Sequence, residues 1–326
     1  MYSNNAAVAR NDIKAFLRQA PKARQMLVAE RIAPFFPVQE PHGRYPVFEI
    51  AGAQILGAPD PTADPTLRRP DGGYNRVKRR HTYDTYDTAS RGLEELVDDV
   101  DRAQMNGRYG FDLEVVTADF LTLNMLLGHE RRVSALVAAI AGTDATADFD
   151  QSDRDAALPV TDILAAIGRM NAKGYIANSL IMPFDIVNEF KFTSEFLAYG
   201  KRIGIARDES AQAITASDIV AAFAEHGIEQ LLIPRASYRA TNPDGAATNT
   251  ALWAANFIAV ADIQDGEPEA GGFARTLYWD AEGGVAYTPE TYRDETRRSD
   301  VIRVRQEDVE KTIDSNAIEK INISIT

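Results

Sequence analysis

The stretch RRHTYDTYDTASRGLEELVDDVDRA, residues 79–103, begins basic, passes through aromatic and threonine residues, and ends acidic. Tyr83, Thr85 and Tyr86 favour a β-strand over residues 76–88. From about Ser90 the apolar residues follow helical spacing, with Gly107 ending the pattern. The apolar positions are Leu93, Leu96, Val97, Val100 and Ala103, and the acidic positions facing elsewhere are Glu94, Glu95, Asp98, Asp99 and Asp101. The stretch therefore predicts a basic strand that leads into an acidic amphipathic helix.

Charge is divided unevenly along the 326 residues. Residues 1–80 hold 13 lysine and arginine against 7 aspartate and glutamate, a net charge of +6. The remaining residues hold 22 against 41 (of totals of 35 and 48), a net charge of −19. The overall charge of −13 argues against a general nucleic-acid binder. We call residues 1–80 the basic front and residues 81–326 the acidic body. These two parts should attract each other, within one molecule or between neighbours.

The basic front combines a short helix with extended chain. Residues 11–32 predict an amphipathic helix with Ile13, Phe16 and Leu17 on one side, interrupted by Pro21. Four prolines in APFFPVQEPHGRYPVFEI, residues 33–50, favour extended chain. The segment from 52 to 73 is too rich in Pro, Gly and Asp for an ordinary connection, so we expect either a surface loop or an arm that finds partners elsewhere.

The acidic body combines long helix, mixed α/β segments and terminal strands. A helix of about 35 Å is predicted over residues 117–141. Its predicted apolar face comprises Phe120, Leu123, Leu127, Val133, Val137 and Ile140. Helix and strand then alternate, including a helix over 159–174 and one capped by Ser217 that ends at Gly227. Further strands are predicted within 178–183, 228–234, 252–263, 273–280, 301–305 and 318–326.

The sequence contains no recognisable catalytic motif. Cysteine is absent, which excludes disulfides and thiolate chemistry, and GxGxxG, GxxxxGK[ST], HExxH and GxSxG are missing. Adjacent His129 and Glu130 could suggest acid–base work, but a solvated helix face is the expected reading. The acidic connector at 144–155 fails the spacing of a calcium loop and is read as hydrated chain, with weak cation binding left open. We expect no catalytic residue, no metal site and no cofactor.

Neither a membrane helix nor a secretory signal is expected from the sequence. No apolar run approaches the roughly 18 residues that a membrane helix needs, so no membrane partner is expected. The first residues, MYSNNAAVARNDIK, do not resemble a secretory signal.

The order of these segments resembles the major capsid (head) proteins of tailed bacteriophages, which share the Hong Kong 97-type fold. VAERIAPFFPVQEPHGRYPVFEI (28–50) resembles the arm entering the family's extended loop, and residues 79–103 resemble the strand that returns from it. LTLNMLLGHERRVSALVAA (121–139) resembles the long spine helix. The segments that resemble the axial domain and the closing strand pair are 158–190, 229–260 and 292–324.

The resemblance implies an α+β fold with four parts. These are an N-terminal arm (1–41), an extended loop (42–86), a peripheral domain with the spine helix (87–155 and 290–326) and an α/β axial domain (156–289). The extended loop would reach over a neighbouring subunit, where its basic residues would meet the acidic helix. The basic residues are Arg68, Arg69, Arg76, Lys78, Arg79 and Arg80, and the acidic residues are Glu94, Glu95, Asp98 and Asp99.

The resemblance also implies partners and a location. Pentamers and hexamers of the chain would form an icosahedral head around double-stranded DNA, bound without sequence specificity, in a virion assembled in the host cytoplasm. The chain has no room for a fused scaffolding segment before the arm, so a separate scaffolding protein and a portal protein are expected. A decoration protein stays open, as does a cross-link of the kind some family members form, for which Lys78 is placed but no partner is identified.

Two alternatives remain. An encapsulin-type nanocompartment shell would share the fold but enclose cargo enzymes instead of DNA. A metal-dependent soluble α/β enzyme would use the acidic cluster around Asp150 and Asp155.

Overall fold

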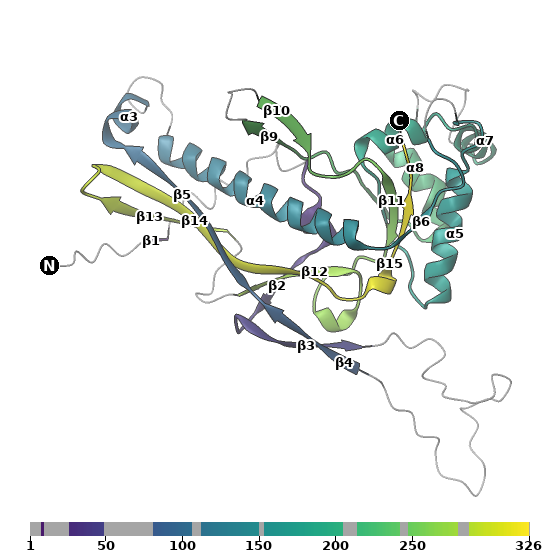
Figure 1. Cartoon of the computed structure of the whole chain (residues 1–326), viewed down its shortest axis with the longest axis horizontal. Helices are drawn as coiled ribbons and strands as arrows, with labels where there is room; N and C mark the ends of the chain where they lie inside the picture. Colours follow the sequence, from purple (N-terminus) through teal and green to yellow (C-terminus); the bar gives the residue numbers. More distant parts are fainter. Residues whose placement is uncertain are drawn as a thin grey trace, which may run out of the picture.

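The computed structural model describes residues 8–9, 26–48, 81–105, 112–149, 153–204, 214–241, 247–279 and 287–325. Within these ranges the strands form a six-stranded sheet, a five-stranded sheet and two separate hairpins. A long helix lies along the six-stranded sheet, and shorter helices gather beside the five-stranded sheet (Figure 1). This arrangement confirms the predicted α+β class.

The six-stranded sheet is organised around one long strand. Its strands are β1 (Val8–Ala9), β2 (Phe35–Val38), β5 (Ala89–Asp98), β12 (Ala274–Trp279), β13 (Thr288–Asp294) and β14 (Ser299–Thr312). β5, β12 and β13 all pair with β14 in antiparallel orientation, while β2 pairs with β12 and β1 with β13. The strand predicted over residues 301–305 is confirmed, but its alternation is not regular, because the adjacent Val301 and Ile302 are both buried.

The predicted long helix is α4 (Leu113–Ala139), which begins one turn earlier than expected. The side chain of Asp112 caps it by accepting hydrogen bonds from the backbone N–H groups of Glu114 and Val115. The N-terminal half of α4 packs on the six-stranded sheet, and its C-terminal half belongs to the core of the five-stranded sheet. The predicted apolar face is wrong at Phe120, whose side chain is 57% exposed, because Leu121 and Met125 face the sheet instead.

The acidic helix predicted from Ser90 is wrong over most of its length. Residues up to Asp98 form strand β5, and only α3 (Asp99–Gln104) is helical. Ten consecutive residues of β5 pair with β14, so long-range backbone pairing overrides the helix-like spacing of Leu93, Leu96 and Val97. Of these three side chains only Val97 is buried. Glu94, Glu95 and Asp98 therefore lie on a strand, and Asp99 is the first residue of α3.

The five-stranded sheet carries the mixed helix and strand pattern predicted for the middle of the chain. Its strands are β6 (Gly142–Asp144), β7 (Ser179–Ile181), β8 (Gln230–Leu232), β11 (Phe257–Ala261) and β15 (Ile318–Asn322). The helices beside it are α5 (Pro159–Ala172), α6 (Phe184–Phe190), α7 (Ser194–Arg202) and α8 (Ala216–Phe223). The predicted cap of α8 is wrong by two residues, since Thr215 rather than Ser217 accepts from the backbone of Asp218.

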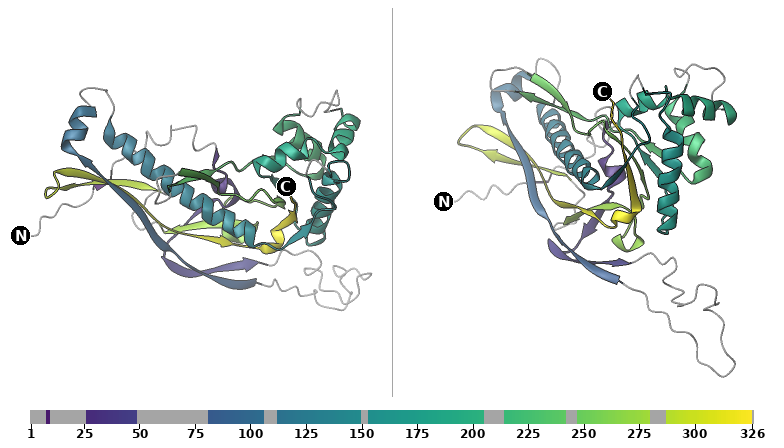
Figure 2. Two further views of the ribbon diagram at one scale, coloured as in Figure 1. Left: turned by 45° about the horizontal axis from the view of Figure 1, so that its top comes forward. Right: turned by 45° about the vertical axis from the view of Figure 1, so that its right-hand side comes forward.

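Two hairpins extend from this frame. β3 (His42–Phe48) pairs with β4 (His81–Asp87), which confirms the extended chain predicted within 33–50 and the strand predicted within 76–88 where these are described. β4 leads through Thr88 into β5, so this hairpin lies at the end of β5 opposite α3 (Figure 2). The second hairpin joins β9 (Ser237–Thr241) to β10 (Ala247–Ala251). Residues 49–80, the tip of the predicted loop, lie outside the described ranges.

The remaining short elements are α2 (Ala29–Ile32) and three 3-10 turns, η4 (Ala224–His226), η5 (Pro268–Ala270) and η6 (Ser315–Ala317). Of the helix predicted over 11–32, residues 26–32 are described, and only α2 is α-helical, so the prediction is wrong at 26–28. Residues 10–25 lie outside the described ranges. Among the helices described, none is long and apolar enough to cross a membrane.

Candidate assembly surfaces

The predicted acidic residues divide into two exposed carboxylates and two that serve the subunit itself. Glu94 and Glu95 are exposed on β5, where Glu94 accepts a hydrogen bond from the Tyr292 hydroxyl at 3.2 Å. Asp98 caps α3 by accepting from the backbone N–H of Val100 at 2.7 Å. Asp99 accepts from Arg293 at 2.5 Å, and this hydrogen bond lowers the pKa of its carboxyl. Glu94 and Glu95 are therefore the members of the set that remain available to a neighbour.

β5 is an edge strand within the described part of the sheet. Its backbone pairs with β14 on one side, and no other described strand pairs with it. Exposed edges are usually protected by charged side chains, proline or a bulge, and β5 has no proline but carries Arg91, Glu94 and Glu95. Leu93 and Leu96 are 41% and 43% exposed along it. The strand therefore presents apolar and acidic groups together beside a free edge.

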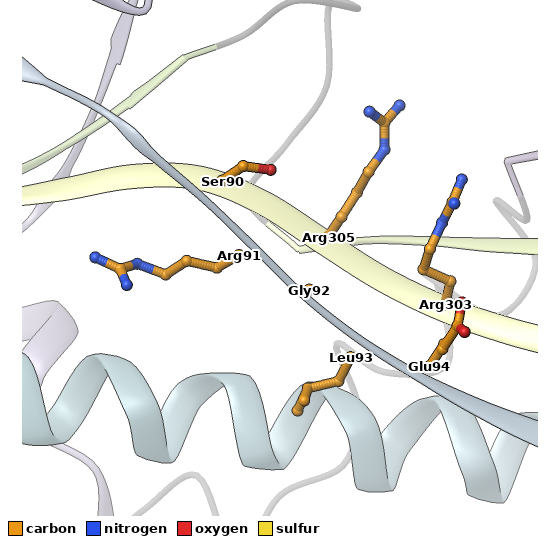
Figure 3. Close-up of a pocket in the computed structure, with 7 residues that line it drawn as sticks. All are labelled: Ser90, Arg91, Gly92, Leu93, Glu94, Arg303 and Arg305. Carbon is orange, nitrogen blue, oxygen red and sulfur yellow. The ribbon is translucent and has the colours of Figure 1, made fainter.

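A shallow hollow of about 320 Å³ lies beside Gly92 of β5, which pairs with Arg305 of β14 (Figure 3). Arg303 and Arg305 project from β14 on the face away from α4, while Leu93 points toward that helix (Figure 3). Both arginines bond Glu290 of β13, at 2.5 Å and 2.7 Å. Burial raises the pKa of Glu290, but these hydrogen bonds outweigh it and lower the pKa below its ordinary value. The hollow's lining carries fixed charges but no nucleophile paired with a base.

A buried ion network holds β5, β14 and α4 together. The Asp308 carboxylate on β14 is fully buried and bonds Arg91 of β5 at 2.6 Å and Arg132 of α4 at 2.9 Å. Arg132 also bonds Glu310 at 2.7 Å. The network therefore joins the sheet edge to the long helix.

The second buried junction attaches the N-terminal arm to α4. Glu130 accepts hydrogen bonds from the backbone N–H groups of Val28 at 3.1 Å and Ala29 at 2.9 Å, and from Trp253 Nε1 at 2.7 Å. The glutamate is fully buried, and burial raises its pKa. One carboxylate thus joins the arm, the long helix and the segment that leads into β11. The expectation of a solvated His129–Glu130 pair is wrong.

His129 holds the next part of the arm. Its Nε2 lies 2.9 Å from Thr276 Oγ1, and that hydroxyl donates to the Ala33 carbonyl at 2.9 Å. Since a hydroxyl has one proton to donate, the imidazole is the donor to Thr276. The ring also stacks on Phe35 with centroids 4.9 Å apart. Burial first, then the charge of Arg132, lower the pKa of His129 to about 3.

A pH dependence follows from this histidine. In the unfolded chain His129 has a pKa of about 6.5 and is protonated below that pH. In the folded protein it stays neutral until the pH falls to about 3. Because the unfolded state binds more protons in this window, stability is lost as the pH falls below 6.5. Relative to a His129→Gln variant, the wild type should lose up to about 1.4 kcal/mol per pH unit between pH 6.5 and 4.5. Urea unfolding across that range measures it, and parallel profiles for the two proteins would contradict it.

The acidic connector does not gather its carboxylates. Asp144 accepts from Asn322 at 3.0 Å, Asp148 from the backbone N–H of Ser324 at 3.0 Å, and Asp155 bonds Ser194. Across the described residues, no three histidine, aspartate or glutamate side chains are close enough together to hold a metal ion. Asp150 lies outside the described ranges.

Some of the charged residues described above could be predicted from the sequence, and others could not. Charge counting pointed to Glu94 and Glu95, whereas His129, Glu130 and Asp308 were missed. Glu130 could have been found from its helical position, four residues after Leu126 and three before Val133, both of which are buried. Asp308 and its arginines come from segments far apart in the chain, and no local pattern brings them together.

No protein-family model and no curated protein matches the sequence. Solved structures, however, match over nearly the whole chain. A phage-related protein from Bordetella bronchiseptica RB50 is 18% identical with a TM-score of 0.66, and the match covers 97% of each chain. The capsid of cyanophage P-SCSP1u is 9% identical, with a TM-score of 0.55, over 92% of this chain and 89% of that one. A virus-like particle from Pyrococcus furiosus is 11% identical, with a TM-score of 0.51, over 96% of each chain.

These likenesses define the fold. The chain has the Hong Kong 97-type fold of capsid proteins, as the sequence predicted. The resemblance to tailed-phage major capsid proteins is thereby confirmed at the level of the fold.

Proposed function

We propose that the protein is the major capsid protein of a tailed bacteriophage, which assembles into pentamers and hexamers of an icosahedral head around double-stranded DNA. The observation that carries this proposal is a fold shared with the capsid of a cyanophage over 92% of the chain. The free edge of β5 adds support, because a shell protein needs surfaces that are satisfied only by neighbours. The role is structural, with no catalytic residue, metal or cofactor.

We retain the proposed division into arm (1–41), extended loop (42–86), peripheral domain (87–155 and 290–326) and axial domain (156–289). Strand pairing differs from it at three places. β12 joins the six-stranded sheet although it falls within 156–289, whereas β6 and β15 join the five-stranded sheet although they fall within 87–155 and 290–326. The axial domain would therefore include β6 and β15 and exclude β12.

Subunit contact is proposed between the basic tip of one extended loop and β5 of a neighbour. The tip carries Arg68, Arg69, Arg76, Lys78, Arg79 and Arg80, all outside the described ranges. Exposed Glu94 and Glu95 are the acceptors, whereas Asp98 and Asp99 hold α3 and Arg293 in place. Single exposed ion pairs contribute only about 0–1 kcal/mol, so such contacts would act through repetition around the shell.

Other partners follow from the proposed role. A separate scaffolding protein and a portal protein would take part in assembly in the host cytoplasm, and the product would be the virion head. DNA would be enclosed without sequence-specific contacts, in keeping with the net charge of −13.

The proposal predicts closed particles. Purified protein, supplied with its scaffolding protein, should form shells with fivefold vertices in negative-stain and cryo-electron micrographs. A chain that stays monomeric at high concentration under those conditions would contradict the proposal. Particles from infected or expressing cells also discriminate between the alternatives, because a head contains DNA and an encapsulin-type compartment contains cargo protein. A small oligomer with metal-dependent turnover would instead favour the enzyme.

A further inference from the structure

The long helix α4 carries a second apolar stripe that faces away from the sheet. Val116 and Phe120 are 52% and 57% exposed, and Leu123 and Leu127 continue the line as half-buried residues. Their spacing of four, three and four residues places them on one side of the helix. The opposite side packs on the six-stranded sheet through Leu121 and Met125. A helix that is apolar on two sides normally has both sides covered.

One end of the stripe lies beside the point where the described arm begins. Glu130, one turn beyond Leu127, holds the backbone N–H groups of Val28 and Ala29. The Met26 carbonyl accepts from the backbone N–H of Arg235 at 3.5 Å. The described arm therefore begins, at Met26, close to the Leu127 end of the stripe, and the preceding described residue, Ala9, pairs with β13.

The sequence of residues 10–25 is complementary to the stripe. It places Ile13, Phe16 and Leu17 at helical spacing and carries five basic residues against one acidic residue, a net charge of +4. Acidic Asp101, Asp112 and Asp119 lie around the N-terminal part of α4. As a helix, residues 11–20, which precede Pro21, span about 15 Å, close to the roughly 17 Å of the stripe from Val116 to Leu127. Residues 10–25 therefore match the stripe in length and in apolar spacing, and their charge is opposite to that of the acidic residues around it.

We propose that residues 10–25 of the same chain cover the outer stripe of α4, with their apolar side on Phe120 and Leu123 and their basic side toward Asp112 and Asp119. The chain's path argues for its own segment, because that segment joins the stripe's end at Glu130 through Met26. This docking is a property of the single subunit and does not depend on shell formation. It would make the arm a part of the folded subunit.

The absence of native cysteine makes the contact directly testable. A subunit with Leu17→Cys and Phe120→Cys should form a disulfide within one chain under mild oxidation at low protein concentration, as should Leu17→Cys with Leu123→Cys. The matched control pairs Leu17→Cys with Ile176→Cys, since Ile176 is 72% exposed on a loop after α5. Disulfide-linked dimers alone would assign the stripe to a second copy, and equal linkage in the control or no linkage would overturn the proposal.

Limited trypsin digestion provides a second measurement. Docked residues 10–25 should be cleaved slowly at Arg18 and Lys22. Phe120→Lys should speed those cleavages by about tenfold, because it removes the largest apolar contact and repels a basic segment. Ile176→Lys adds the same charge elsewhere and should leave the rate unchanged. Equal cleavage rates in the wild type and the Phe120→Lys variant would overturn the proposal even if a disulfide can be trapped.

Discussion

A Glu130→Ala variant is expected to lose about 3–5 kcal/mol of unfolding free energy, measured by urea denaturation of the subunit. The substitution removes the acceptor of three hydrogen bonds whose donors, in Val28, Ala29 and Trp253, are all buried. A buried donor left without an acceptor costs about 1–3 kcal/mol. The total is less than the simple sum because the carboxylate itself is costly to bury, which is why its pKa is raised.

Two further variants separate the acceptor from the charge. Glu130→Gln keeps one carbonyl oxygen, so it should lose less than the alanine variant. Trp253→Phe removes one of the three donors and should reduce the additional effect of Glu130→Ala when the two are combined. Arg131→Ala, at an exposed position of the same helix, is the matched control and should change stability by no more than about 0.5 kcal/mol. A loss below about 1 kcal/mol for Glu130→Ala would show that the junction does not hold the arm.

The same residue shows why the fold was easier to predict than the junction. α4 is long and strongly periodic, and the chain before it is restricted by prolines, so both could be identified from local sequence. His129 and Glu130 were taken as solvated because charged residues are usually exposed. Their partners, in segments 100 or more residues away, cannot be identified from local spacing.

β5 illustrates the opposite case, in which a local pattern misled. Leu93, Leu96 and Val97 have helical spacing, but the helix would have had to outweigh ten backbone pairs with β14, about 200 residues further along the chain. The strand is exposed, so the alternation that usually marks a half-buried strand is missing. Glu94 and Glu95 were nevertheless correctly expected at the surface, because their exposure depends on charge more than on the element that carries them.

Reversing Arg76, Arg79 and Arg80 to glutamate is expected to abolish shell formation or make it strongly dependent on salt. If the loop tip rests on β5 of a neighbour, the variant replaces attraction to Glu94 and Glu95 with repulsion at every copy of the contact. Salt screens exposed charges beyond roughly 8–10 Å, so added salt should partly relieve the repulsion. Light scattering across ionic strength measures particle yield. Thermal unfolding of the free subunit should change little, since surface substitutions usually stay within about 0.5 kcal/mol.

A charge swap makes this result specific to the two surfaces. Glu94→Lys with Glu95→Lys should block assembly when introduced alone, and should restore it at low salt when combined with the three arginine reversals. Asp98 and Asp99 must be left in place, because they cap α3 and bond Arg293, so their replacement would disturb the subunit itself. Normal assembly of the arginine variant at low salt would show that this loop does not hold neighbours electrostatically. Failure of the combined variant, with its subunit still folded, would show that the loop's partner is a different acidic surface.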